Sequence, residues 1–160
     1  PLVMMSYLNP LLAFGYDALA ERALTAGVCG FIIPDLPFEE SADIRAALEA
    51  RGLGLIQLVT PATPDDRLQT LCEASRGFVY AVTITGITGG GTGLPADLTD
   101  YLDKVSGMSS IPVCAGFGIR AAKDVAAVGK HAAGAIVGSA LVEVLERGDD
   151  PGDYLGSLRA

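Results

Sequence analysis

Two glycine-containing segments in the last third of the sequence have the composition of a phosphate site. Gly116-Phe117-Gly118 and Gly138-Ser139 each follow a short apolar run and precede a segment with helical spacing. Small residues let backbone N–H groups approach an anion, and the amino end of a helix favours negative charge. The spacing therefore predicts a phosphate group held between these two segments. The alternative is that the glycines only form tight turns.

Residues 116–121 also match the dinucleotide-binding pattern G-x-G-x-x-A. That pattern requires an acidic residue about 20 positions further on, at the end of the next strand, to bind the ribose. The sequence has Gly138-Ser139 there instead, and the match lies in the last units of the chain rather than the first. A dinucleotide site is therefore disfavoured.

The segment Thr85–Gly93 is rich in glycine, which makes it too flexible for a well-defined turn. We interpret it as a lid that orders over a bound substrate and excludes water. A flexible connector is the alternative.

Few other residues have the types and spacing that catalysis needs. The single histidine, His131, falls at the end of a predicted helix, on the side opposite the carboxyl ends of the predicted strands. This position excludes a Ser/His/Asp arrangement. One histidine and scattered cysteines cannot supply a metal site, so we expect no metal and no cofactor. Asp35 follows a predicted strand; it could act as an acid or base, hydrogen-bond its own loop, or face a partner.

These residues need a scaffold, and the hydrophobic pattern predicts alternating strands and helices. Apolar runs predict buried strands at Leu2–Ser6, Gly30–Ile33, Leu53–Val59, Phe78–Val82, Ile111–Ala115 and Ala135–Val137. Apolar residues at helical spacing follow each run. Thr63 is expected to cap the helix after the third strand, with Pro64 at its first position. Asp150 is expected to cap the last helix. Right-handed crossovers then give an α/β fold, either a doubly wound sheet or a barrel, with ligands at the carboxyl ends of the strands.

The length indicates how much of a barrel is present. A full (β/α)8 TIM barrel needs about 250 residues, whereas this sequence has 160. The six strand–helix units are consistent with strands three to eight, as a single partial domain over residues 1–160. Because the sequence enters an apolar run directly at Pro1, we expect the first part of the barrel to be missing. Open edges at Leu2–Met5 and Ala135–Val137 then predict poor solubility or dimers.

The composition limits the classes of partner. The net charge of −8 argues against binding to nucleic acid or anionic membranes, but allows a phosphate held by backbone amides. No apolar stretch approaches the ~20 residues of a membrane-spanning helix. Cys29, Cys72 and Cys114 lie in apolar segments and no signal peptide is present, so we expect reduced core residues in a cytoplasmic protein.

Several longer motifs occur in a specific order along the chain. They are Met5-Ser6-Tyr7-Leu8-Asn9-Pro10, Pro34-Asp35-Leu36-Pro37-Phe38-Glu39-Glu40-Ser41, Gly86-Ile87-Thr88-Gly89, Gly116-Phe117-Gly118-Ile119 and Gly138-Ser139-Ala140. In these motifs the sequence resembles the tryptophan synthase α subunit family along essentially its whole length. The resemblance implies a TIM barrel that cleaves indole-3-glycerol phosphate to indole and glyceraldehyde 3-phosphate in tryptophan biosynthesis. It also implies a β-subunit partner, in an α2β2 heterotetramer, that receives indole through a tunnel.

The resemblance also assigns roles to individual residues. The positions that match the family's phosphate site are Thr88 (on its lid), Gly89, Gly118, Gly138 and Ser139. The positions that match its indole pocket are Tyr7, Tyr80 and Phe117, although Tyr80 could instead be a tyrosine of the barrel core. The positions that match the rim facing the β subunit are Asn9, Asp35 and Pro37.

The family's two catalytic carboxylates, a Glu on strand two and an Asp on the loop after it, have no counterpart in this sequence and are expected upstream of Pro1. Proton transfer to the indole ring and from the indole nitrogen and glycerol hydroxyl requires both groups. The arginine that some members carry before the lid is also absent. We therefore expect the 160-residue chain alone to be inactive. The alternatives are a non-catalytic module that activates the β subunit, or another phosphosugar-binding TIM-barrel enzyme.

Overall fold

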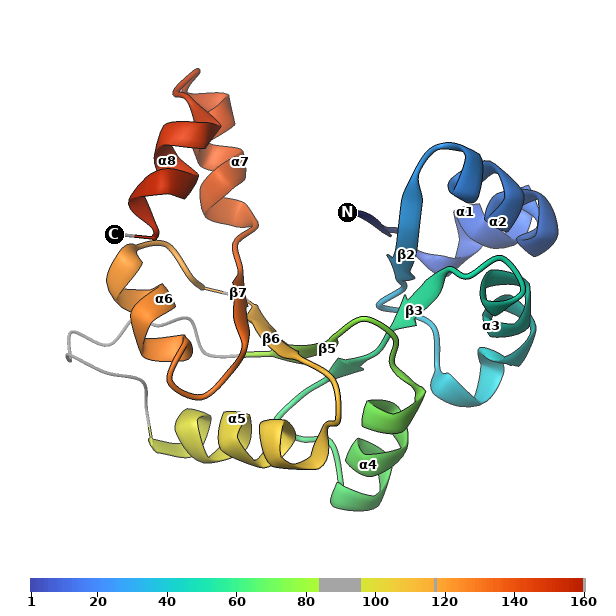
Figure 1. The fold of residues 1–160 in the computed structure, drawn as a ribbon, viewed down its shortest axis with the longest axis horizontal. Helices are drawn as coiled ribbons and strands as arrows, with labels where there is room; N and C mark the ends of the chain where they lie inside the picture. The colour runs from blue at the N-terminus through green and yellow to red at the C-terminus, as the bar shows by residue number, and fades with distance from the viewer. Residues whose placement is uncertain (84–95, 117, 160) are drawn as a thin grey trace.

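The computed structural model of the chain describes residues 1–83, 96–116 and 118–159. Figure 1 shows the strands side by side in a curved wall, with helices on its outer side. All strand pairs are parallel and follow the order of the chain, as β1-β2-β3 and β4-β5-β6-β7. The strands are β1 (Leu2–Met5), β2 (Val28–Ile32), β3 (Gly54–Ile56), β4 (Leu58–Val59), β5 (Val79–Val82), β6 (Val113–Gly116) and β7 (Gly134–Ile136).

The helices alternate with these strands, as the hydrophobic pattern predicts. They are α1 (Leu8–Phe14), α2 (Tyr16–Thr25), α3 (Ala42–Glu49), α4 (Asp65–Ala74), α5 (Ala96–Met108), α6 (Ala122–Val128), α7 (Ser139–Glu146) and α8 (Pro151–Ser157), with a short 3-10 helix η1 (Phe38–Glu40) before α3. The predicted α/β class and the parallel barrel arrangement are confirmed. Two helices, α1 and α2, lie between β1 and β2, where the sequence pattern predicts one helical segment.

The third predicted strand is divided at Gln57, which separates β3 from β4. The N–H of Gln57 donates to Ser75 Oγ at 3.0 Å, and its carbonyl accepts from the N–H of Tyr80. The backbone N–H of Gln57 is thereby diverted from the strand ladder to a side chain that follows α4. Consequently β3 pairs with β2 while β4 pairs with β5, and the wall bends at this point.

Apolar side chains cover both faces of the wall, as expected for parallel strands. The inner face carries a cluster formed by Ile32, Ile56 and Tyr80. The outer face packs against the helices through two separate clusters. One joins β2 and β3 to α2 and α3, around Phe31; the other joins β4, β5 and β6 to α4, α5 and α6, around Leu102.

Two local predictions at helix starts had different outcomes. Asp150 caps α8 as predicted, because its carboxylate accepts from the N–H groups of Gly152 and Asp153. The prediction that Thr63 caps α4 was wrong. Its hydroxyl instead accepts from the N–H of Thr60 at 3.0 Å and closes the preceding turn, so Pro64 occupies the N-cap position.

The prediction that all three cysteines lie in the core was wrong for Cys29. Cys72 is buried and Cys114 is partly buried, whereas Cys29 is exposed. Cys29 lies near the amino end of β2, where it lines an open cavity of about 560 Å³ together with Pro1 and Gly52. Its apolar neighbours along the sequence therefore did not indicate its own environment.

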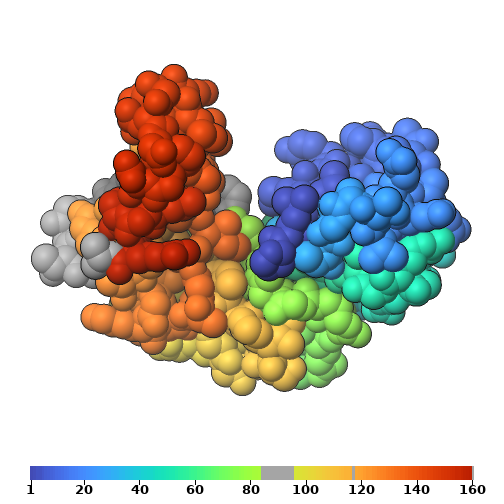
Figure 2. Space-filling model, turned by 45° about the horizontal axis from the view of Figure 1, so that its top comes forward, coloured from blue at the N-terminus to red at the C-terminus, as the bar shows by residue number. Residues whose placement is uncertain are grey.

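The wall is open between its first and last strands. Within the described chain, β1 and β7 form the two ends of the strand order, which are the predicted edges. Leu2 and Met5 on β1 are 56% and 54% exposed. Figure 2 shows the molecule hollowed between its N-terminal elements and the α7–α8 pair. In the described residues, none of the helices has the length and apolar character needed to span a membrane.

Candidate functional site

The two glycine-containing loops leave adjacent strands at the same end of the wall. Gly116 at the end of β6 lies in register with Ile136 at the end of β7. The segments after these strands stay together, because the side chain of Arg120 forms an ion pair with Glu143 on α7. The hydroxyl of Tyr154 on α8 donates to the carbonyl of Arg120 at 2.9 Å. The Gly118 loop is thus joined to the middle of α7 and to α8.

Gly118 has a backbone conformation that its loop requires. Its φ is +83°, in the left-handed region that residues with a Cβ rarely adopt. The next residue, Ile119, is buried in the outer core and anchors the loop. Gly118 itself is exposed, so its backbone is accessible from the mouth of the barrel.

The amino end of α6 is already occupied by a side chain of the protein. The carboxylate of Asp124, a residue only 6% exposed, accepts hydrogen bonds from the N–H groups of Arg120 and Ala121, both at 3.0 Å. These two amides precede Ala122, the first residue of α6. The carboxylate of Asp124 therefore makes them unavailable to an external ligand.

The amino end of α7 is open to a ligand. Gly138 takes the N-cap position without a side chain, and Ser139 begins the helix. The N–H groups of Leu141 and Val142 donate to the carbonyl of Gly138, while those of Ser139 and Ala140 belong to the first turn, where a helix offers no acceptor. Gly138 and Ser139 are both exposed. The positive end of α7 therefore faces the mouth of the barrel.

An apolar cavity of about 540 Å³ opens at the carboxyl ends of the strands. Its lining residues are Met5, Ser6, Tyr7, Pro34, Leu58 and Val82. The structure places Tyr7 here as expected. Sequence reasoning missed the other lining residues. Leu58 and Val82 could have been predicted to line the cavity from their position near strand ends, because alternate residues of a barrel strand point inward.

Tyr80 lies deeper than the cavity lining. It is 7% exposed and packs with Ile32 and Ile56 on the inner face. Burial raises the pKa of its hydroxyl, so Tyr80 remains neutral at physiological pH. The ring lies directly across Gly116: a Cβ at Gly116 would come within 2.3 Å of the Tyr80 hydroxyl oxygen. In the described residues Tyr80 therefore has the packing of a barrel-core tyrosine, close to the mouth.

Three other predicted residues lie on one exposed rim. Asn9 is on α1, and Asp35 and Pro37 are on the loop after β2. The carboxylate of Asp35 accepts a hydrogen bond from the N–H of Leu8 at 2.8 Å, which ties this loop to the start of α1. The hydrogen bond of Asp35 is thus to the start of α1 and not to its own loop. Thr88, Gly89 and Phe117, and the predicted lid Thr85–Gly93, lie outside the described residues.

His131 lies away from this site, as predicted. It follows α6 and precedes β7, at the amino-end rim of the strands, and its Nδ1 contacts Asp103 Oδ1 at 2.7 Å. Across the described part of the chain, no group of three His, Cys, Asp or Glu side chains is arranged to hold a metal ion.

Comparison with known proteins places this geometry in one family. A family model described as tryptophan synthase alpha chain matches residues 1–155. The tryptophan synthase alpha chain of Carboxydothermus hydrogenoformans is 47% identical over 146 residues, which cover 91% of this chain and 55% of that protein.

Solved structures agree with this assignment. A tryptophan synthase structure from Mycobacterium tuberculosis superposes with a TM-score of 0.86 at 38% identity, covering 98% of this chain and 60% of that one. A tryptophan synthase α2β2 complex from Pyrococcus furiosus superposes with a TM-score of 0.88 at 30% identity, covering 99% and 66%. The chain thus spans little more than half the length of the curated relatives it matches. It belongs to the tryptophan synthase alpha chain family.

Proposed function

We propose that this chain supplies the substrate-binding part of a lyase that cleaves indole-3-glycerol phosphate to indole and glyceraldehyde 3-phosphate. One observation carries the proposal: the loop at Gly118 and the open amino end of α7 follow adjacent strands, beside an apolar cavity. This combination suits a molecule with a phosphate at one end and an aromatic ring at the other.

The phosphate end would be held by backbone amides. We assign it to Gly118, Gly138 and Ser139, with Thr88 and Gly89 of the lid completing the site. The internal cap of α6 by Asp124 leaves the start of α7 as the source of positive potential. A protein with a net charge of −8 can bind an anion in this way, because the attraction is local.

The indole end would occupy the apolar cavity. Leu58, Val82 and Tyr7 line it. We assign Tyr80 to the same indole pocket and Phe117 to its phosphate end. Burying an indole ring against such side chains contributes affinity through the hydrophobic effect.

The proton transfers of the cleavage reaction need acidic and basic groups in this cavity. Among its lining residues in the described chain, none carries a carboxylate. Carbon–carbon cleavage here requires a group that protonates the indole ring and a group that removes protons from the indole nitrogen and the glycerol hydroxyl. We therefore propose that the 160 residues bind the substrate without turning it over by themselves.

We further propose a tryptophan synthase β subunit as the partner. The Pyrococcus furiosus relative is described as an α2β2 complex. The exposed rim with Asn9, Asp35 and Pro37 is the surface that we assign to this contact. The hydrogen bond from Leu8 to Asp35 would keep the two loops of this rim in one arrangement.

A binding experiment tests the phosphate assignment. Titration of the 15N-labelled chain with glycerol 3-phosphate should shift the amide signals of Gly118 and Ser139. Ser139→Asp places a negative charge at the anion site and should weaken binding at least tenfold. Ser110→Asp makes the same change on an exposed turn before β6, at the opposite rim, and should leave binding intact. Equal binding by both variants would refute the assignment.

The proposal on turnover needs a separate assay. Indole release from indole-3-glycerol phosphate should be undetectable with the 160-residue chain, with or without an added β subunit. Indole release at a rate comparable to that of a full-length relative would contradict it.

A further inference from the structure

A second cavity lies beside the mouth cavity, with which it shares Pro34 and Leu58, in the seam between the two outer core clusters. It has a volume of about 390 Å³ and is bounded by the loop after β2, by β3 and β4, and by α4. The cluster beneath α3 ends at Leu55, and the cluster beneath α4 resumes at Val59. Gln57 occupies the position between them, where the strand divides.

The side chain of Gln57 is the unusual feature of this cavity. The residue is 7% exposed, and its backbone N–H and carbonyl are both hydrogen-bonded. Within the described residues its side-chain amide has no hydrogen-bond partner, and no fully enclosed side-chain polar atom lacks one. The Gln57 amide must therefore face the cavity. The amide atoms are thus accessible from the cavity, where a ligand or water can pair with them.

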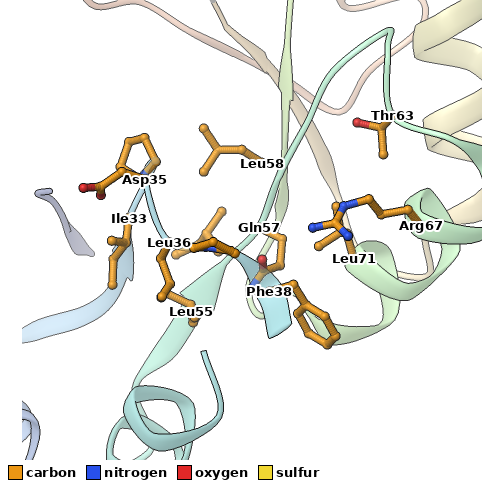
Figure 3. Close-up of a pocket in the computed structure, with 13 residues that line it drawn as sticks. Ile33, Asp35, Leu36, Phe38, Leu55, Gln57, Leu58, Thr63, Arg67 and Leu71 are labelled. Atoms are coloured by element: carbon orange, nitrogen blue, oxygen red, sulfur yellow. The ribbon is translucent and has the colours of Figure 1, made fainter. Parts of the chain in front are cut away.

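The other polar side chains of the lining are already engaged. Arg67 forms two hydrogen bonds with Glu39, at 2.5 and 3.1 Å. Asp35 accepts from Leu8, and the Thr63 hydroxyl accepts from the N–H of Thr60. In Figure 3 the Arg67 guanidinium points toward Gln57, which lies beside Phe38. Polar recognition in this cavity therefore falls to the Gln57 amide, which offers one donor group and one acceptor.

The other lining side chains limit the charge and polarity of a ligand. The apolar lining side chains include Ile33, Leu36, Phe38, Leu55 and Leu71. The rim carries the carboxylates of Asp35 and Glu39, and only Glu39 is neutralised, by Arg67. An anionic ligand would be repelled by Asp35, and an apolar one would leave the Gln57 amide unpaired.

We propose that this seam cavity binds a small neutral molecule that combines an apolar ring with an amide-type donor and acceptor, paired with the side chain of Gln57. The site borders the proposed indole cavity, with which it shares Pro34 and Leu58, but it does not include the residues assigned to the phosphate and does not depend on the proposed lyase function.

Benzamide is a suitable probe, because it is neutral and planar and carries one amide on an apolar ring. Titration of the 15N-labelled chain should give saturable shifts in the side-chain NH2 signals of Gln57 and the amides of Leu36 and Leu71. Gln57→Leu should weaken benzamide binding at least tenfold. Gln69→Leu, the same change on an exposed residue of α4, should not. Gln57→Met gives a second variant without the amide, should Gln57→Leu fail to fold.

Two ligand controls sharpen the test. Benzoate, with the same ring and a negative charge, and toluene, with no polar group, should each bind at least tenfold more weakly than benzamide. Glycerol 3-phosphate binding should be unchanged in Gln57→Leu, which separates this site from the proposed phosphate site. Non-saturable shifts, or benzamide binding that survives in both Gln57 variants, would show a cavity filled by water only and overturn the proposal.

Discussion

The contact between Gly116 and Tyr80 gives a sharp prediction about the barrel mouth. A Cβ at position 116 would lie 2.3 Å from the Tyr80 hydroxyl oxygen, 2.6 Å from Cζ and 2.7 Å from Cε1. Real Cβ atoms do not approach other heavy atoms so closely. Neither the Gly116 backbone nor the Tyr80 ring can shift freely to relieve this contact. Gly116 is hydrogen-bonded in β6 between β5 and β7, and the Tyr80 ring is packed in the inner cluster.

Gly116→Ala should therefore destabilise the chain by about 1–3 kcal/mol, the usual cost of overpacking a core. Tyr80→Leu removes the ring and should cost on the order of 2–3 kcal/mol by itself, because it leaves a cavity. In the double variant the added methyl enters that space, so the total should fall short of the sum by about 1 kcal/mol or more. Urea unfolding, followed by circular dichroism, measures all three free energies of unfolding.

Two controls make this cycle specific. Tyr80→Phe should give no relief to Gly116→Ala, because Cζ and Cε1 remain within 2.7 Å. Gly107→Ala, on an exposed part of α5 with nothing within 4 Å of its Cβ, should raise stability by up to about 1 kcal/mol through helix propensity. Additive effects at Gly116 and Tyr80, within about 0.5 kcal/mol, would refute the proposed clash.

Two further predictions concern the α6 cap and buried thiols. Asp124→Ala leaves the amides of Arg120 and Ala121 without their acceptor, so it should cost about 1–2 kcal/mol in urea unfolding; unchanged stability would contradict the capping role. Burial raises the pKa of Cys72 and of Cys114 above the ordinary 9.0. The folded chain then binds more protons than the unfolded chain above pH 9, so its stability should fall as the pH rises there. Cys72→Ala should make this fall shallower in unfolding measured from pH 7 to 10.5, and an identical slope would argue against it.

The sequence predicts the repeating scaffold well because its signals are local. Every predicted strand overlaps an observed one, since runs such as Phe78–Val82 must be buried on both faces. The two glycine loops were also located correctly, because a strand end, a small residue and a helix start follow one another along the chain. These features need no knowledge of distant residues.

Features that depend on contacts between distant residues could not be predicted in this way. Gln57 lies inside an apolar run, and only Ser75, which follows α4, explains why the strand divides there. Cys29 has apolar neighbours yet faces an open cavity formed with Pro1 and Gly52. The ring of Tyr80 across Gly116 joins two strands that lie more than thirty positions apart in sequence. In each case the decisive partner comes from another strand–helix unit.

The two helix starts at the barrel mouth show how one position can divide structural from binding roles. In α6 the third helical residue is Asp124, whose carboxylate returns to the preceding amides and occupies them. In α7 the third helical residue is Leu141, which has no acceptor, and the N-cap is Gly138, which has no side chain. The same strand–loop–helix geometry therefore carries a capping carboxylate in one unit and none in the next. The ion pair between Arg120 and Glu143 joins the two units. Under the proposed phosphate assignment, anion affinity at this mouth depends on the absence of a capping side chain at α7 as much as on the glycines.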